Sequence, residues 1–240
     1  MEKKEEQNWF EQAVSFFEQG DYHRALECYE QALKTDSGNE RAWNNKGNAH
    51  LALKNHEQAV ACYEKALEIN PGYVRAWYNK GNAFRGLKEY EKSIFCYEKV
   101  NELDPSHVRA WNNKGNSFLE LHKIEESIAC YNKAIASDPN QAFLWNNKGN
   151  ACLKLQDNQA ALACYDKALE LDPNYASAWN NLGNVYVNLK EFQKARTCYQ
   201  KAQSLDPKKH ASAWTVFKKA FKESFKQVSF FRKKKNKPAV

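Results

Sequence analysis

The chain has 240 residues, with 36 Lys or Arg against 29 Asp or Glu and a formal net charge of +7. It has no run of about 18 apolar residues, and residues 1–7 are charged, so we expect neither a membrane-spanning helix nor a secretion signal. Residues 210–240 carry a net charge of +8, which leaves −1 for the rest, so the part of the chain before this tail is not basic overall.

Tryptophan recurs every 34 residues, at positions 9, 43, 77, 111, 145 and 179. Each Trp is followed at fixed distances by further recurring residues, which in the second repeat are Gly47, Ala59, Tyr63 and Pro71. A fixed period of this size is typical of stacked units that cannot bury their apolar faces alone. We therefore expect function on an extended surface and not in a closed pocket.

The recurring residues predict two helices per repeat. Gly within a helix costs about 1 kcal/mol relative to Ala, so its return at 47, 81, 115, 149 and 183 predicts a close approach of the paired helix. Small residues such as Ala59 would face that contact, with Tyr63 beside it. Segments such as 53–55 would form the turn, and Pro71 would end the second helix.

This spacing of Trp, Gly, Ala, Tyr and Pro resembles the tetratricopeptide repeat. The resemblance implies an all-α, right-handed superhelical solenoid of six helix-turn-helix repeats with a C-terminal capping helix. The expected parts are an extension (1–5), six repeats (6–39, 40–73, 74–107, 108–141, 142–175 and 176–209), the capping helix (210–231) and a basic tail (232–240). The first repeat has Ala13 in place of Gly and Ser37 in place of Pro, as expected for a terminal repeat.

Six of the seven cysteines occupy one position of the repeat, next to the core Tyr. Equivalent positions in stacked repeats are too far apart for disulfides, so we interpret these residues as small core residues, with metal or redox chemistry as the alternative. Reduced thiols indicate a cytoplasmic location, or else a nuclear one. The sequence has no CxxC, Gly-rich phosphate loop, GxSxG or HExxH motif, so we expect no metal site, no cofactor and no catalysis.

Asparagine recurs on the face of each first helix opposite to Trp and Gly, where we place Arg41, Asn44, Asn45, Asn48 and Ala52. Asn is a poor helix former, and its amide can pair with any peptide backbone. In tetratricopeptide proteins this face lines a concave groove, and the array resembles an asparagine ladder that holds extended peptides. The implied peptide-binding residues are Asn45, Asn48, Asn79, Asn82, Asn113, Asn116, Asn147, Asn150, Asn181 and Asn184. The alternative is that they solvate this face or link neighbouring helices.

The first position of the same face is an arginine in three repeats, at Arg41, Arg75 and Arg109. In the two repeats that follow, the equivalent residues are Phe143 and Ser177. Guanidinium groups favour carboxylates, which predicts an acidic or C-terminal peptide segment for this half; pairing with acids of adjacent repeats is the alternative. The family's carboxylate clamp for chaperone tails matches only in part. A further row, Lys46, Lys80, Lys114 and Lys148, is expected to cover apolar surface and not to bind.

Apolar residues of the tail recur at spacings of three or four, from Trp214 to Val228, with lysines between them. This pattern predicts an amphipathic helix that caps the last repeat. We expect a non-catalytic scaffold or adaptor that binds an extended, acidic peptide of a partner protein. The alternative function is peripheral anchoring by the basic tail on an anionic membrane surface or on nucleic acid.

Overall fold

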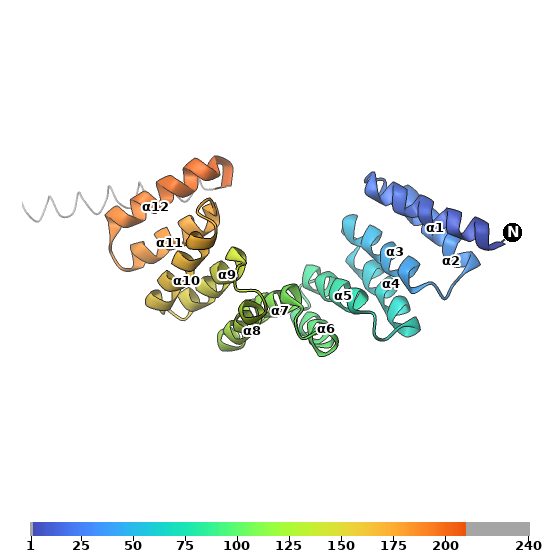
Figure 1. Cartoon of the computed structure of the whole chain (residues 1–240), viewed down its shortest axis with the longest axis horizontal. Helices are drawn as coiled ribbons and strands as arrows, with labels where there is room; N and C mark the ends of the chain where they lie inside the picture. The colour runs from blue at the N-terminus through green and yellow to red at the C-terminus, as the bar shows by residue number, and fades with distance from the viewer. Residues whose placement is uncertain (1, 210–240) are drawn as a thin grey trace, which may run out of the picture. The chain divides into compact units, whose positions relative to one another are not determined.

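The computed structural model describes the backbone of residues 2–209 and the side chains of residues 9–209. Over this part the chain forms twelve α-helices and no strand, which confirms the predicted all-α class (Figure 1). The helices are α1 (Glu2–Glu18), α2 (Tyr22–Thr35), α3 (Glu40–Ala52), α4 (His56–Ile69), α5 (Val74–Gly86), α6 (Tyr90–Leu103), α7 (Val108–Glu120), α8 (Ile124–Ser137), α9 (Ala142–Lys154), α10 (Asn158–Leu171), α11 (Ala176–Asn188) and α12 (Phe192–Leu205). The predicted capping helix (210–231) and basic tail (232–240) lie outside the described residues, and the predicted extension overlaps the start of α1.

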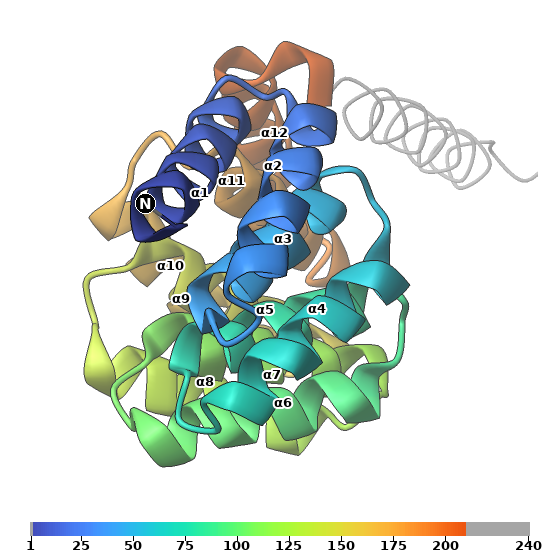
Figure 2. The same cartoon turned by 90° about the vertical axis from the view of Figure 1, so that its right-hand side faces the viewer.

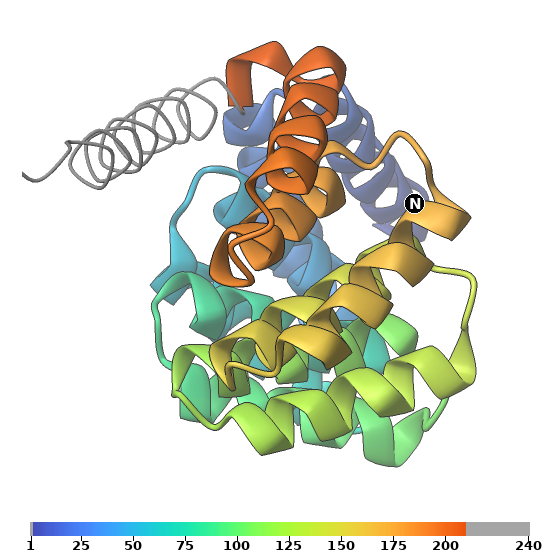
Figure 3. The same ribbon diagram turned by 90° about the vertical axis from the view of Figure 1, so that its left-hand side faces the viewer.

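The chain divides into two compact units, Met1–Ser137 and Asp138–Val240, which we call the N-terminal and C-terminal lobes. Within each lobe an odd-numbered helix packs on the even-numbered helix that follows it, and that helix packs on the next odd-numbered one. Figure 2 shows these pairs in the N-terminal lobe from blue α1 to green α8, and Figure 3 shows the yellow and orange pairs of the C-terminal lobe. Odd-numbered helices also contact one another, so they form a continuous layer within each lobe.

The two helices of a repeat touch at the recurring Gly. A Cβ atom on Gly47 would lie 2.6 Å from Cε1 of Tyr63, which is closer than any real contact of that kind. The same relationship recurs at Gly81, Gly115, Gly149 and Gly183, each against the Tyr sixteen residues later. Tyr63 is fully buried beside Ala59. The predicted close approach is confirmed, and it requires Gly because the Tyr ring occupies the space of a side chain.

The turn between paired helices has one left-handed residue. In the third repeat Lys88 has a φ of 61°, its amide donates to the carbonyl oxygen of Arg85, and the amide of Glu89 donates to that of Phe84. These two bonds satisfy carbonyls that the helix end leaves unpaired, in a Schellman arrangement. Gly20 takes this position in the first repeat with a φ of 80°. The same turn therefore forms with or without glycine.

From α3 onward, the recurring Trp bonds each first helix to the loop that precedes it. The indole Nε1 of Trp77 donates to the carbonyl oxygen of Pro71 at 2.9 Å, and Trp43 bonds that of Ser37 at the same distance. Trp111, Trp145 and Trp179 make the equivalent bonds. Because the acceptor is a main-chain oxygen, Ser37 replaces Pro without loss of the bond.

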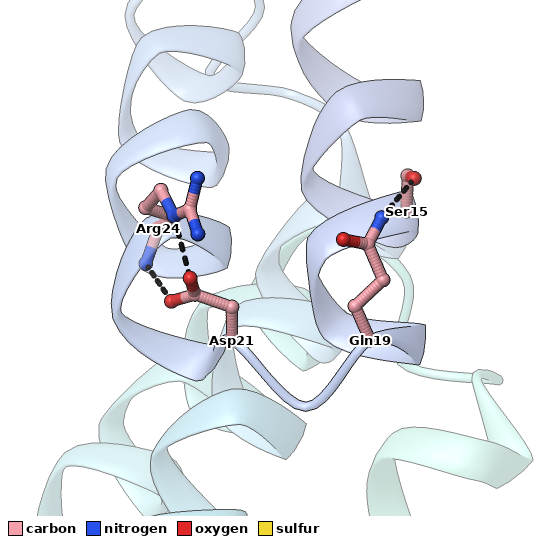
Figure 4. A network of polar contacts seen from close by, with 4 residues as sticks. All are labelled: Ser15, Gln19, Asp21 and Arg24. Carbon is pink, nitrogen blue, oxygen red and sulfur yellow. Dashed lines mark hydrogen bonds and ion pairs between the residues drawn. The ribbon is translucent and has the colours of Figure 1, made fainter.

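The first repeat has its own polar contacts at the turn between α1 and α2 (Figure 4). The carboxylate of Asp21 caps α2 by accepting from the backbone amide of Arg24 at 3.2 Å, and it also pairs with the guanidinium of Arg24. The backbone hydrogen bond, helped by the guanidinium, lowers the pKa of Asp21. Across the turn, Nε2 of Gln19 donates to Oγ of Ser15 at 3.0 Å. These contacts end α1 and begin α2.

None of the helices within residues 2–209 has the length together with the apolar character that crossing a membrane requires.

Candidate functional site

The candidate site consists, in each lobe by itself, of two Asn positions on every odd-numbered helix: α3, α5 and α7 in the N-terminal lobe, and α9 and α11 in the C-terminal lobe. We call the residues equivalent to Asn45 and Asn48 the polar face. In α3 they follow Arg41 at spacings of four and three residues, so the three side chains share one side of the helix. Asn45 and Asn48 are half-buried, as are their equivalents in α5, α7, α9 and α11.

The second Asn of each helix is held by the core Tyr of the same repeat. The Tyr63 hydroxyl donates to Oδ1 of Asn48 at 2.8 Å, and the Tyr97 hydroxyl donates to Oδ1 of Asn82 at the same distance. Later repeats have the same bond between Tyr131 and Asn116, Tyr165 and Asn150, and Tyr199 and Asn184. Because Oδ1 is directed at the core, the opposite end of each amide, Nδ2, is directed away from that bond.

The first Asn of a helix links its repeat to the preceding one. Asn79 donates from Nδ2 to Oδ1 of Asn44 at 3.1 Å and to Oδ1 of Asn48 at 3.0 Å. Asn113 makes the corresponding bonds to Tyr78 and Asn82, and Asn181 makes them to Asn146 and Asn150. The alternative interpretation, that these asparagines link neighbouring helices, is therefore correct for Asn79, Asn113 and Asn181.

The placement of Asn44 on the outward face was wrong. Asn44, Asn112 and Asn146 are buried, with 3%, 7% and 4% exposure. For Asn44 and Asn146 the next odd-numbered helix of the same lobe covers this side. Asn44 also donates from Nδ2 to Oδ1 of its neighbour Asn45 at 3.1 Å. These buried amides belong to the contact between repeats. Helical phase alone does not reveal this, because the covering helix comes from another repeat.

Part of the hydrogen-bonding capacity of the polar face remains for a ligand. In the described part of the chain, Oδ1 of Asn48 accepts from both Tyr63 and Asn79, whereas its Nδ2 donates to no group. Asn82 has the same arrangement with Tyr97 and Asn113. Each such amide thus retains donor hydrogens in a fixed orientation.

The three arginines at the start of the face are exposed. Arg41, Arg75 and Arg109 form no ion pair with any residue in 9–209, so the alternative of pairing with acids of adjacent repeats is not found there. The guanidinium of Arg41 lies 5.6 Å from the centre of the Phe10 ring, a cation–π distance. Their charge is available to a ligand.

A hollow of about 230 Å³ adjoins the polar face between α1, α2 and α3. Its wall combines the face with apolar side chains of the first repeat. The lining residues are Val14, Phe17, Glu18, Tyr29, Asn45 and Asn48. Val14 and Phe17 are not among the binding residues predicted from the sequence, although their helical spacing from Phe10 is a usable signal.

The lysines equivalent to Lys80 pack over apolar side chains, as predicted. Three of them also form ion pairs, which were not predicted. Nζ of Lys80 lies 2.9 Å from a carboxylate oxygen of Glu64 and 5.4 Å from the centre of the Trp77 ring. Lys46 pairs with Glu30 at 3.0 Å and Lys114 with Glu98 at 2.9 Å. These lysines are committed to the contact between repeats, beside Trp.

The cysteines of the described repeats are buried free thiols. Burial raises the pKa of Cys62, Cys130 and Cys198 to about 11, which keeps them protonated near neutral pH. Within the described side chains, no group of three or more His, Cys, Asp or Glu is placed to hold a metal ion.

Comparisons with solved structures give the same fold. MamA from Desulfovibrio magneticus RS-1 (residues 41 to the end) matches with a TM-score of 0.67 and 20% identity, covering 71% of this chain and 96% of that one. A crystal structure described as YrrB, a TPR protein with an unusual peptide-binding site, matches with a TM-score of 0.63 and 22% identity over 80% and 99%. PilF of Pseudomonas aeruginosa reaches a TM-score of 0.74 at 16% identity, over 91% and 99%.

No curated protein matches the chain. Sequence profiles described as tetratricopeptide repeat match residues 10–74, 74–107, 108–141, 130–163 and 176–209, and a profile described as TPR repeat matches residues 149–190. Together these matches cover nearly all of the described chain, and the matches to 74–107, 108–141 and 176–209 each coincide with one helix pair. The chain therefore belongs to the tetratricopeptide repeat family.

Proposed function

We propose that this protein is a non-catalytic interaction scaffold that binds an extended segment of a partner protein along the polar face. The tetratricopeptide fold, which the chain shares with its structural neighbours, is a scaffold for protein interaction. Binding along the polar face is proposed because Asn48 and Asn82 have a fixed orientation. In each, Oδ1 is bonded to a core Tyr and Nδ2 is left as a donor.

The donors of Asn48 and Asn82 match the carbonyl groups of a peptide backbone. Every residue of an extended chain presents a carbonyl oxygen, so this recognition depends little on the sequence of the partner. The amides are already held by Tyr63, Tyr97 and the next repeat, so binding would immobilise few additional side chains. Preorganisation of this kind increases affinity because less conformational entropy is lost.

The arginines add a chemical preference to the N-terminal lobe. Arg41, Arg75 and Arg109 are exposed without carboxylate partners in the described structure, at the start of the polar face. Guanidinium forks bind carboxylates in two-point contacts, so we propose an acidic peptide segment here. The adjoining hollow, with Val14 and Phe17 in its wall, would accept an apolar side chain of that segment.

The neighbouring YrrB structure, described as having an unusual peptide-binding site, is in keeping with a peptide ligand. The free thiols of the described repeats agree with a reducing, cytoplasmic or nuclear compartment. The second candidate function is peripheral anchoring by residues 210–240, and its supporting observation is their net charge of +8. Binding of that kind to an anionic membrane or nucleic acid would weaken steeply with added salt, whereas an amide contact would not.

The test uses a peptide selected from a random-peptide library on the intact chain, with its affinity measured by fluorescence anisotropy. The variant is Asn82→Asp, which keeps an oxygen acceptor for Tyr97 and Asn113, removes the amide donors and adds one negative charge. The matched control is Asn132→Asp, an exposed position of α8 that makes the same charge change on an even-numbered helix.

We expect Asn82→Asp to weaken peptide binding about tenfold or more, since a lost hydrogen bond to a positioned polar group costs about 1–3 kcal/mol, and Asn132→Asp to leave it unchanged. Melting temperatures of both variants establish that the repeats remain folded. Equal affinities of the two variants would show that the polar face only holds the repeats together.

A further inference from the structure

The fifth repeat has a cysteine at two core positions, and no other repeat does. Cys164 belongs to the cysteine row of the second helices, whereas Cys152 lies on the first helix, α9. The equivalents of Cys152 in the other repeats are larger rings, namely Phe16, His50, Phe84, Phe118 and Tyr186. The exclusion of disulfides between equivalent positions of stacked repeats does not apply to this pair, because both residues lie in one repeat.

The two thiols face each other across the contact between α9 and α10. Cys152 and Cys164 are each 4% exposed, and the two thiols are near enough to affect each other's ionisation. The helices approach closely at this level of the repeat, where a Cβ on Gly149 would lie 2.7 Å from the Tyr165 ring. Two neighbouring thiols on facing helices are the reactants from which a disulfide forms.

The two thiols differ in acidity. The neighbouring thiol of Cys164, together with the ammonium of Lys148 one turn earlier, lowers the pKa of Cys152. The thiol of Cys152 and burial raise the pKa of Cys164. Mainly through burial, the pKa of Cys96, the residue of the third repeat that is equivalent to Cys164, is raised to about 12. Cys152 therefore has the larger thiolate fraction, and the thiolate is the form that reacts with oxidants.

We infer that Cys152 and Cys164 form a redox-active dithiol that hydrogen peroxide closes into a disulfide between α9 and α10. In the first step the Cys152 thiolate attacks one peroxide oxygen, the O–O bond breaks, and the released hydroxide takes up a proton to give water and a Cys152 sulfenic acid. In the second step Cys164 sulfur, losing its proton, attacks the Cys152 sulfur and expels the sulfenic oxygen as a second water. The two thiols are oxidised, and one peroxide is reduced to two waters.

The disulfide would tie the two helices of the repeat that carries Asn147 and Asn150. Cys152 follows Asn150 by two residues on α9, so the bond would restrain the end of this helix beside the polar face. A disulfide also restricts the unfolded chain, so the oxidised protein should melt at a higher temperature than the reduced protein.

The test is peptide mapping of the full chain after hydrogen peroxide treatment, alkylation of the remaining thiols and tryptic digestion without reductant. Cleavage after Lys148, Lys154 and Lys167 places Cys152 in the peptide 149–154 and Cys164 in the peptide 155–167. We expect a linked species whose mass is that of the two peptides less two hydrogen atoms, and its loss when reductant is added. Cys96 and Cys130 serve as internal controls and should be recovered alkylated.

Two variants keep the inference testable if one of them folds poorly. Cys152→Phe restores the ring found in the third and fourth repeats, and Cys164→Ser removes the partner thiol with little change in volume. Both should abolish the linked species, and Cys164→Ser should leave Cys152 as a sulfenic acid that reacts with dimedone. Recovery of both peptides fully alkylated from the oxidised native chain, or linkage of either cysteine to a different one, would overturn the inference.

Discussion

The phenolic hydroxyl of Tyr97 donates a hydrogen bond to Oδ1 of Asn82 at 2.8 Å, across the contact between α5 and α6. The same oxygen accepts from Nδ2 of Asn113, on the first helix of the next repeat, at 3.0 Å. One amide oxygen thus joins two helices of one repeat to the following repeat. The polar face is consequently part of the fold, and substitutions on it affect stability as well as binding.

Removal of the Tyr97 hydroxyl tests this link. We expect Tyr97→Phe to lower the free energy of unfolding by about 1–2 kcal/mol, because a buried acceptor loses a partner while the ring still packs on Gly81. Urea unfolding followed by circular dichroism measures the change. Tyr90→Phe, at the start of α6, removes a hydroxyl that makes no such bond in the described structure and should change stability by only a few tenths of a kcal/mol. Similar effects of the two variants would contradict the prediction.

A buried amide that has no partner among the described residues is a weak point of the third helix pair, α5 and α6. Asn101 is 8% exposed, and neither its Nδ2 nor its Oδ1 has a hydrogen-bond partner, whereas the equivalent residues Leu33, Leu67 and Leu169 are apolar and buried. We expect Asn101→Leu to raise the free energy of unfolding by about 1–3 kcal/mol, because the desolvation penalty of the amide disappears. Differential scanning calorimetry would show a higher melting temperature. A lower melting temperature would indicate that the amide is satisfied in solution.

The Gly–Tyr contact predicts a destabilising alanine. Gly81→Ala should lower the free energy of unfolding by about 1–3 kcal/mol despite the better helix propensity of Ala, because the new Cβ would lie 2.7 Å from Cε1 of Tyr97. Gly72→Ala is the matched control, since its Cβ would meet only Asn70, at 3.5 Å. Chemical denaturation measures the free energy of unfolding of both variants. Equal stabilities would show that α5 and α6 can move apart to make room for the new Cβ.

The left-handed turn residue predicts a stabilising glycine. Lys88 has a φ of 61°, a conformation that costs a residue with a Cβ about 1 kcal/mol relative to Gly. Lys88→Gly should raise the free energy of unfolding by about 0.5–1 kcal/mol, measured by urea denaturation. In contrast, Lys92→Gly on the helical, exposed part of α6 should lower it by about 1 kcal/mol. The prediction fails if both changes have the same sign.

The buried acidic groups predict a loss of stability at high pH. Burial raises the pKa of three core tyrosines, Tyr29, Tyr131 and Tyr199, from 10.0 to about 12, and that of three core cysteines, Cys62, Cys130 and Cys198, from 9.0 to about 11. These groups are protonated in both states below about pH 9, so their contribution to stability is fully present there. Between the unfolded and folded pKa values the unfolded chain holds fewer protons than the folded chain.

Stability should therefore fall as pH rises from about 9 to 12, by up to about 1.4 kcal/mol per pH unit for each group. Urea midpoints across this range measure the decline, and the ultraviolet absorbance of tyrosinate should appear together with the loss of helical circular dichroism. Tyrosinate absorbance from a chain that remains helical would contradict the prediction.

The sequence by itself determined the features that depend on one repeat. The 34-residue period, the helical phase of Trp and Gly, and the small residues opposite Gly are local patterns, and they predict paired helices with Gly47 against Tyr63. The family resemblance rests on the same positions. All of these features need only the helical repeat of about 3.6 residues and the volume of one side chain.

Only the tertiary structure decided which polar atoms are already used. The sequence places Asn79 on a face that could bind a peptide, but it does not say that its amide reaches Asn44 and Asn48 in the preceding repeat. Nor does it show that the ionisation of Cys152 is coupled to the thiol of Cys164. The physical reason is that such contacts depend on how neighbouring helices are rotated and spaced against each other, whereas periodicity in the sequence fixes only the direction of a side chain around its own helix.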